Sequence, residues 1–152
     1  SHLQRLCDAL DKARPSGHTR LSAGVDRLGR LASRRGLVVV LSDFFGDIET
    51  CMRGLKRLRA AGHDVLVLQT LDDDELTFPF EGTVLFEGLE QKERLLVEPR
   101  LVRQTYLEQL NAHIDAVREA CLADGIRHML VNTHEEPIVQ IRRILVERSG
   151  RG

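Results

Sequence analysis

Residues 36–47, GLVVVLSDFFGD, decide the fold class of this chain of 152 residues. Residues 37–41 are all aliphatic, a pattern typical of a strand that is buried on both faces in the middle of a parallel sheet. Strand interiors avoid charge, so Asp43 is expected at the point where the strand ends. Ligands of open α/β sheets bind at this carboxyl edge, which makes Asp43 the first candidate site residue.

Hydrophobic periodicity on both sides of this stretch predicts alternating helices and strands. Helices are expected over 3–10, 21–31, 48–61, 99–123 and 137–145, and strands over 37–42, 64–69 and 128–132. The pattern predicts an antiparallel hairpin from 83–87 and 93–97 and an acidic loop over 71–76. Strand, helix and strand in succession favour a right-handed parallel crossover. The predicted fold class is therefore α/β, with a mainly parallel sheet and a β-hairpin insertion.

Composition limits the classes of protein to consider. Hydrophobic residues make up 42% and charged residues 30% of the chain, which predicts one globular domain over 1–152. Aromatic residues make up only 4%, with no Trp, so stacking platforms for single-stranded nucleic acid are not expected. Residues 1–36 carry eight Lys or Arg against three Asp, but these arginines have the helical spacing of a solvated face. We therefore expect no nucleic-acid partner.

Cysteine usage and hydropathy indicate a cytoplasmic protein. The three cysteines lie far apart without C-x-x-C spacing, so neither a disulfide framework nor a zinc site is indicated. No apolar run approaches the roughly 20 residues of a membrane helix. HExxH, GxSxG, GxGxxG and Walker A motifs are absent from the sequence, and we expect a protein that is not an enzyme.

Two loops carry the residue types that bind a hard divalent cation. Thr19 stands at a predicted helix start and Asp43 at a predicted strand end, and hydroxyl and carboxylate oxygens are ligands for such ions. Each has an ordinary structural alternative, since Thr is a common N-cap and Asp a common strand terminator. Asp47 is expected to cap the helix that follows it. Phe44 and Phe45 form either an exposed partner-binding tip or, for at least one of them, a contact beneath that helix.

Several motifs resemble a known family. The segments SGHTRL (16–21), RRGLVVVLSDFFGD (34–47), GHDV (62–65), TFPFEG (77–82) and FEGLE (86–90) carry the similarity. They resemble the second half of a von Willebrand factor A-like domain and, more narrowly, the bacterial domain-of-unknown-function 58 family. The resemblance implies a doubly wound sheet with a hairpin insertion.

The family resemblance also implies a metal-ion-dependent adhesion site built from three loops. Thr19 matches its Thr loop and Asp43 its later Asp loop, whereas the opening Asp-x-Ser-x-Ser motif occurs nowhere in the sequence. We therefore interpret the chain as the C-terminal part of such a domain, with residues 1–2 as a tag remnant. Mg²⁺ binding by this chain alone is expected to be weak or absent, and strand 37–42 is expected to self-associate through an open edge.

The function implied is that of a bacterial protein-interaction module, often paired with a MoxR-type AAA+ ATPase in complex assembly. The alternative is a receiver-like domain that accepts a phosphoryl group on Asp43. A receiver also needs an acidic pair after an earlier strand and a Lys after a later one, and Lys12, Lys56 and Lys92 do not stand at such a position.

Overall fold

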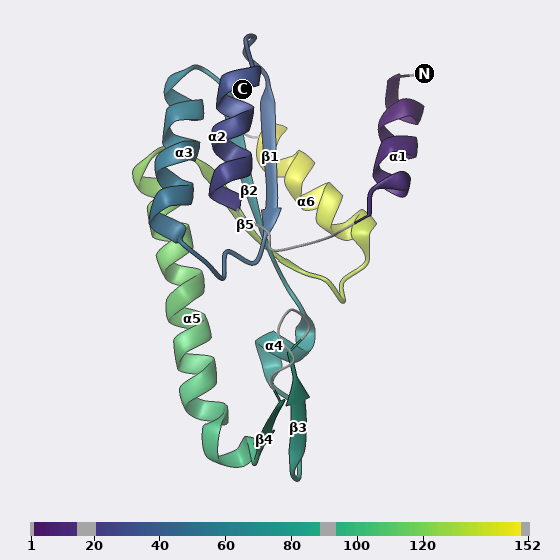
Figure 1. The fold of residues 1–152 in the computed structure, drawn as a ribbon, viewed down its shortest axis with the longest axis vertical. Coiled ribbons are helices and arrows are strands. Elements are labelled where there is room, and N and C mark those ends of the chain that lie inside the picture. Colours follow the sequence, from purple (N-terminus) through teal and green to yellow (C-terminus); the bar gives the residue numbers. More distant parts are fainter. Residues whose placement is uncertain (1, 15–20, 89–93, 150–152) are drawn as a thin grey trace.

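The computed structural model describes residues 2–14, 21–88 and 94–149, and Figure 1 labels its helices and strands. In chain order they are α1 (His2–Lys12), α2 (Leu21–Leu31), β1 (Leu37–Ser42), α3 (Ile48–Ala60), β2 (Asp64–Leu71), α4 (Asp73–Thr77), β3 (Val84–Glu87), β4 (Arg94–Val97), α5 (Pro99–Ala123), β5 (Arg127–Asn132) and α6 (Pro137–Ser149). The predicted strand 37–42 and the predicted helix starts at Ile48, Pro99 and Pro137 are confirmed. Among the described residues, no helix has both the length and the apolar character needed to cross a membrane.

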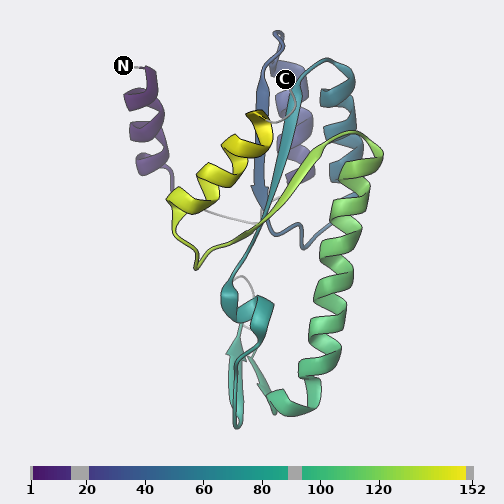
Figure 2. The same cartoon turned by 180° about the vertical axis from the view of Figure 1, so that it is seen from behind.

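The main sheet consists of three parallel strands in the order β1-β2-β5. Leu37 of β1 pairs with Asp64 of β2, and Leu66 of β2 pairs with Arg127 of β5. Helices α2, α3 and α5 lie on one face of this sheet and α6 lies on the other (Figures 1 and 2). The α/β class with a parallel sheet is therefore confirmed.

Strand β1 corrects one expectation about burial. Val38 and Val40 are 8% and 7% exposed, but Leu37, Val39 and Leu41 are 46%, 41% and 64% exposed. The prediction of a central strand buried on both faces is wrong in both parts: β1 is an edge of the described sheet, and the buried cluster on its second face contains no β1 residue. The second face of β1 is thus an uncovered apolar stripe.

The core lies mainly between the sheet and the helices α2, α3 and α5. Its buried members include Val25, Val38, Val40, Leu55, Leu58, Val65, Val67 and Val117. On the opposite face Leu66, Leu68 and Met129 form a smaller cluster against Ile144 of α6. Strand β2 contributes residues to both clusters and is therefore buried on both faces. Strand β1 contributes only to the larger cluster, so only one of its faces is buried.

Local signals in the sequence fix the ends of the helices. Asp47 caps α3 by accepting a hydrogen bond from the Thr50 amide at 2.9 Å, as predicted. Gly62 follows α3 with φ 90°, and Gly125 follows α5 with φ 64°. Residues with a side chain adopt this left-handed backbone reluctantly, so the two predicted glycine stops allow each chain reversal into a strand.

The acidic segment after β2 differs from the expected loop. Strand β2 continues to Leu71, and the short helix α4 begins at Asp73. Asp72 and Glu75 form a capping box. The Asp72 side chain accepts a hydrogen bond from a backbone amide in the first turn of α4, and the Glu75 side chain accepts one from the backbone amide of Asp72. The cluster of carboxylates is therefore used to start a helix.

The predicted hairpin is present as β3 and β4, which pair antiparallel from Val84 opposite Val97 to Glu87 opposite Arg94. Its predicted turn, together with residue 93, lies outside the described residues. The hairpin projects beyond the carboxyl end of the parallel sheet and runs beside the first part of α5 (Figures 1 and 2).

Candidate functional site at the carboxyl edge of the sheet

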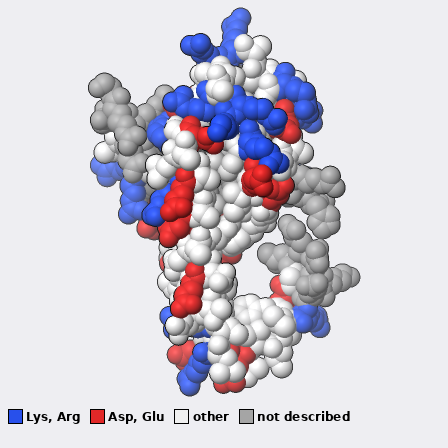
Figure 3. Space-filling view, turned by 90° about the vertical axis from the view of Figure 1, so that its left-hand side faces the viewer, with Lys and Arg blue, Asp and Glu red and all other residues white. Residues whose placement is uncertain are grey.

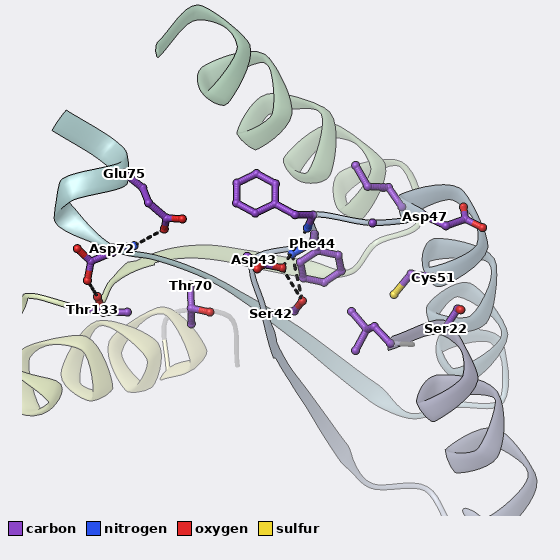
Figure 4. A pocket seen from close by; sticks show the side chains of 14 residues that line it. Ser22, Ser42, Asp43, Phe44, Asp47, Cys51, Thr70, Asp72, Glu75 and Thr133 are labelled. Atoms are coloured by element: carbon purple, nitrogen blue, oxygen red, sulfur yellow. Dashed lines mark hydrogen bonds between the residues drawn. The ribbon is translucent and has the colours of Figure 1, made fainter. Parts of the chain in front are cut away.

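A polar cavity of about 770 Å³ lies where the carboxyl ends of the parallel strands meet, and we name it the carboxyl-edge cavity. Its polar lining residues are Ser22, Ser42, Asp43, Asp47, Thr70, Asp72, Glu75 and Thr133. Figure 4 shows two groups of them, one around Asp43 at the end of β1 and one around Asp72 at the end of β2. The position is the one expected for a ligand site in an open α/β sheet.

The loop after β1 is held by hydrogen bonds from side chain to backbone. The Phe44 amide donates to Ser42 Oγ at 3.0 Å, and the Phe45 amide donates to Asp43 Oδ1 at 3.0 Å. Phe44 has a φ of 62°, a backbone conformation that is unfavourable for a bulky residue and that the surrounding structure must hold in place. Among hydrogen bonds within the described residues, none reaches Asp43 Oδ2, so this oxygen remains available to a ligand.

The backbone of Asp43 is fixed by a hydrogen-bonded network centred on the buried Gln69. Its carbonyl accepts hydrogen bonds from His113 Nε2 at 3.0 Å and from Gln69 Nε2 at 3.4 Å. Gln69 is fully buried and its Oε1 lies 3.0 Å from His128 Nε2. Burial, with a smaller effect from Arg118, lowers the pKa of His128. The neutral imidazole therefore completes a relay of hydrogen bonds across β1, β2 and β5.

Asp72 defines the other side of the cavity. Its Oδ2 accepts a hydrogen bond from Thr133 Oγ1 at 2.6 Å, and its Oδ1 accepts one from the Asp74 amide at 3.0 Å. The Thr133 hydroxyl, followed by the Asp74 amide, lowers the pKa of Asp72. Glu75 Oε2 accepts from the Asp72 amide at 2.8 Å. Both carboxylate oxygens of Asp72 are thus engaged within the protein, in contrast to those of Asp43, where hydrogen bonds from the described residues reach only Oδ1.

Asp47 and Cys51 close the cavity on the α3 side. Hydrogen bonds from the side chain and backbone of Thr50 lower the pKa of Asp47. Cys51 is 2% exposed, and burial, assisted by the charge of Asp47, raises the pKa of its thiol to about 11. The thiol is therefore protonated and unreactive at neutral pH.

The structure describes one of the two metal ligands predicted from the sequence. Thr19 lies outside the described residues, whereas Asp43 lines the cavity with hydroxyls nearby. Within the described part of the chain, no group of three or more His, Cys, Asp or Glu side chains could hold a metal ion. The oxygen donors are of the kind that Mg²⁺ uses, but too few of them are free to form a complete coordination shell.

The two phenylalanines after Asp43 have different environments. Phe44 is 3% exposed and packs in the core, whereas Phe45 is 54% exposed. Phe45 stacks on His113, with ring centroids 4.7 Å apart. A partner-binding surface at this loop would therefore be formed by Phe45 and not by Phe44.

No Lys is among the residues that line the carboxyl-edge cavity. Lys56 pairs with Asp124 at 2.7 Å, near the end of α5 that leads into the start of β5. This is the amino end of the sheet, opposite Asp43. The described residues thus bring no cation of the receiver kind to Asp43.

Sequence reasoning missed Asp72 and Thr133 as members of the site. A usable signal was present, because Asp72 directly follows β2 and Thr133 directly follows β5. The carboxyl ends of adjacent parallel strands lie at one edge of a sheet, so both residues could have been grouped with Asp43.

The fold and this cavity define the class of protein as an α/β domain with carboxylates and hydroxyls around a cavity at the carboxyl edge of a parallel sheet. The chain belongs to the family described as "Protein of unknown function DUF58", which it matches over residues 1–116. It is 29% identical over 130 residues to the uncharacterized protein Rv1480 of Mycobacterium tuberculosis, covering 84% of this chain and 40% of that protein. It is 28% identical to the uncharacterized protein MAV169 of Mycobacterium avium, covering 84% of this chain and 75% of that protein.

These relatives are longer than the chain. The chain spans about 40% of the length of Rv1480 and of the equally similar protein Mb1516 of Mycobacterium bovis. No solved structure matches the chain.

Proposed function

We propose that this chain is the C-terminal part of a von Willebrand factor A-like module that binds a protein partner and is not an enzyme. The observation that carries the proposal is the arrangement around Asp43, which leaves one carboxylate oxygen unengaged by the described residues in a cavity rich in hydroxyls. Carboxylate and hydroxyl oxygens are the ligands of a hard divalent cation, and the family resemblance implies a metal-ion-dependent adhesion site at this position.

The proposal assigns the metal to Asp43 and Thr19, with Mg²⁺ as the ion. Ser42 and Asp72 are already hydrogen-bonded within the protein, so this chain alone would bind Mg²⁺ weakly. We propose that a longer protein adds a strand beside β1, where Leu37, Val39 and Leu41 are exposed, and with it the missing ligands. The greater length of the relatives is consistent with such an addition.

Phe45 is the proposed contact for the partner, beside the metal. Its exposed ring is supported from behind by His113, which limits the conformational freedom lost on binding. Family resemblance suggests a MoxR-type AAA+ ATPase in the cytoplasm as this partner, acting in complex assembly.

The test is a calorimetric titration of Mg²⁺ and Mn²⁺ into this chain and into a version extended upstream. We expect the extended protein to bind more tightly and Asp43→Ala to abolish binding. Asp47→Ala is the matched control, since Asp47 lines the same cavity but is engaged as a helix cap. Failure of the extended protein to bind either ion would remove the metal from the proposal.

A separate experiment tests the partner. A MoxR-type ATPase is titrated against the extended protein and against its Phe45→Ser and Leu122→Ser variants. Leu122 is 66% exposed on α5 and serves as a matched apolar control. The proposal predicts that only Phe45→Ser weakens binding, and equal binding by both variants would contradict it.

A further inference from the structure

A second cavity, of about 720 Å³, lies apart from the carboxyl edge, between α4, the hairpin and the first turns of α5. We name it the hairpin groove. Its walls are mainly apolar and include Phe78, Phe80, Phe86, Leu95, Val97 and Leu101. A concave site of this size, with an apolar lining and few polar groups, is typical of a ligand-binding site.

The floor of the groove is a packed set of aromatic rings. The Phe78 ring centroid lies 4.5 Å from that of Tyr106, 5.1 Å from that of Phe80 and 6.0 Å from that of Phe86. Phe78 is 6% exposed and adopts a left-handed backbone, φ 47°, at the end of α4. Its amide donates to the Asp74 carbonyl at 2.9 Å. The floor is therefore formed before any ligand arrives.

The rim of the groove is apolar and uncovered. Leu95 on β4 is 64% exposed, and Leu101 and Val102 on α5 are 78% and 38% exposed. Exposed apolar side chains gathered around a concavity mark an interaction site more often than isolated ones do.

Among the described residues that line the groove, the charged ones are both acidic, Asp74 and Glu75. Arg103 is close by and its guanidinium donates to the Thr77 carbonyl at 3.0 Å. Glu75 Oε2 accepts from the Asp72 amide, while none of the described residues hydrogen-bonds the Asp74 carboxylate. Burial, followed by the negative charge of Glu75, raises the pKa of Tyr106. Lys and Arg are most numerous at the end of the molecule remote from the hairpin, where α2 ends and β1 begins, and others lie at the hairpin end (Figure 3), where Arg94 pairs with Glu87.

We propose that the hairpin groove docks a protein segment that sets apolar side chains on the aromatic floor and a Lys or Arg beside Asp74. An amphipathic helix with leucines on one face and a flanking cation has this chemistry. The carboxylates at the groove disfavour an anionic partner such as an acidic lipid surface or a nucleic acid. This inference does not use the proposed metal site, whose cavity shares only Glu75 with the groove among the described lining residues.

Tyr106 provides a local reporter of binding. It is the only Tyr in a sequence without Trp, and it lines the groove. The probe is a synthetic amphipathic helix made only of Leu and Lys, titrated while Tyr106 fluorescence is recorded. Peptides of the same length made of Leu and Glu, or of Ser and Lys, are the comparators. We expect saturable binding of the Leu–Lys peptide alone, weakened by added salt.

Variants locate the binding to the groove. Leu101→Asp is expected to weaken the Leu–Lys peptide about tenfold or more, because burying a charge in an apolar contact is costly. Leu122→Asp is the matched control on the same helix and should leave binding unchanged. Asp74→Asn should weaken binding about fivefold, whereas Asp8→Asn on α1 should not. Leu95→Asp repeats the test from the hairpin side, should Leu101→Asp disturb α5.

Three results would overturn the proposal. The first is the absence of any Tyr106 response to the Leu–Lys peptide, or an equal response to the Leu–Glu peptide. The second is equal weakening by Leu101→Asp and Leu122→Asp. The third is evidence that the groove has a different occupant. In that case the protein would bind neutral lipid vesicles, or a second copy of itself in sedimentation, but not the peptide, and Leu101→Asp would abolish this association.

Discussion

Helix α2 packs against α3 where Val25 meets Gly54, and this contact holds the Ser22 wall of the carboxyl-edge cavity in place. A Cβ added at Gly54 would lie 2.6 Å from Val25 Cγ1, closer than Cβ atoms approach in real proteins. Val25 is only 5% exposed and cannot swing into solvent. At Gly24, on α2, an added Cβ would meet nothing within 4 Å. Gly54→Ala and Gly24→Ala therefore make one chemical change in two packing environments.

The magnitudes follow from two opposing effects. Ala in place of Gly inside a helix stabilises by about 1 kcal/mol, and overpacking a close contact costs roughly 1–3 kcal/mol. Gly24→Ala should raise the free energy of unfolding by about 1 kcal/mol. Gly54→Ala should leave it unchanged or lower it by up to about 2 kcal/mol. Because the helix preference is common to both, the difference between the variants isolates the packing cost and amounts to roughly 2–12 °C in Tm.

Thermal and urea unfolding followed by circular dichroism measure these differences. A Val25→Ala background supplies the internal check, since it removes the Cγ atoms that the new Cβ would meet. In that background Gly54→Ala should stabilise as Gly24→Ala does. If Gly24→Ala and Gly54→Ala shift Tm equally in the wild-type background, the close approach of α2 to α3 is refuted.

Three further outcomes are expected. The pKa of His128 is lowered in the folded state, so the unfolded chain binds the proton more readily. The free energy of unfolding should therefore fall as pH drops below about 6.5. Urea unfolding at several pH values measures this fall, which should be smaller in His128→Gln than in the wild type. Burial raises the pKa of the Cys121 thiol to about 12 and that of the Cys51 thiol to about 11. An alkylating reagent should therefore modify the exposed Cys7 first, as detected by mass spectrometry. Early modification of either buried thiol would contradict the packing. Leu41→Lys should weaken self-association through the β1 edge about tenfold, and sedimentation at several concentrations measures it, with a wild-type chain that stays monomeric counting against the edge.

Local residue chemistry was enough to predict the three strands of the parallel sheet, although β2 runs two residues beyond its predicted end and β5 begins one residue early. Asp47 and Gly62 act on their own neighbours through a cap and a left-handed turn, so their effect could be read without knowledge of the rest of the chain. The capping box of Asp72 and Glu75 is equally local, and its Asp-x-x-Glu spacing was a signal that the prediction of an acidic loop overlooked.

The burial of β1 could not be predicted in the same way. Its run of aliphatic residues describes what the strand can bury, whereas exposure depends on which elements cover it. Val38 is buried in the core with residues of α2 and α3, while Val39 is exposed and is not part of the cluster that packs against Ile144 of α6. Strand order and helix placement are properties of the whole chain, and no local pattern contains them.

The same distinction explains why the candidate site was predicted only in part. The Asp43 carbonyl is fixed by His113, which is 70 positions away, and by Gln69, and neither spacing has a recognisable motif. The carboxylates that gather with Asp43 have different fates: Asp47 and Asp72 are engaged at helix starts and their pKa values are lowered by the groups they cap or bind. Among hydrogen bonds within the described residues, both carboxylate oxygens of Asp72 are engaged, whereas those of Asp43 and Asp47 are engaged only at Oδ1. Asp43 differs from Asp47 in that its backbone carbonyl is held by His113 and Gln69. Substitution of Asp43 removes a loop hydrogen bond from the Phe45 amide, whereas substitution of Asp72 removes those from Thr133 and the Asp74 amide. We therefore expect substitution of Asp43 to lower stability less than substitution of Asp72.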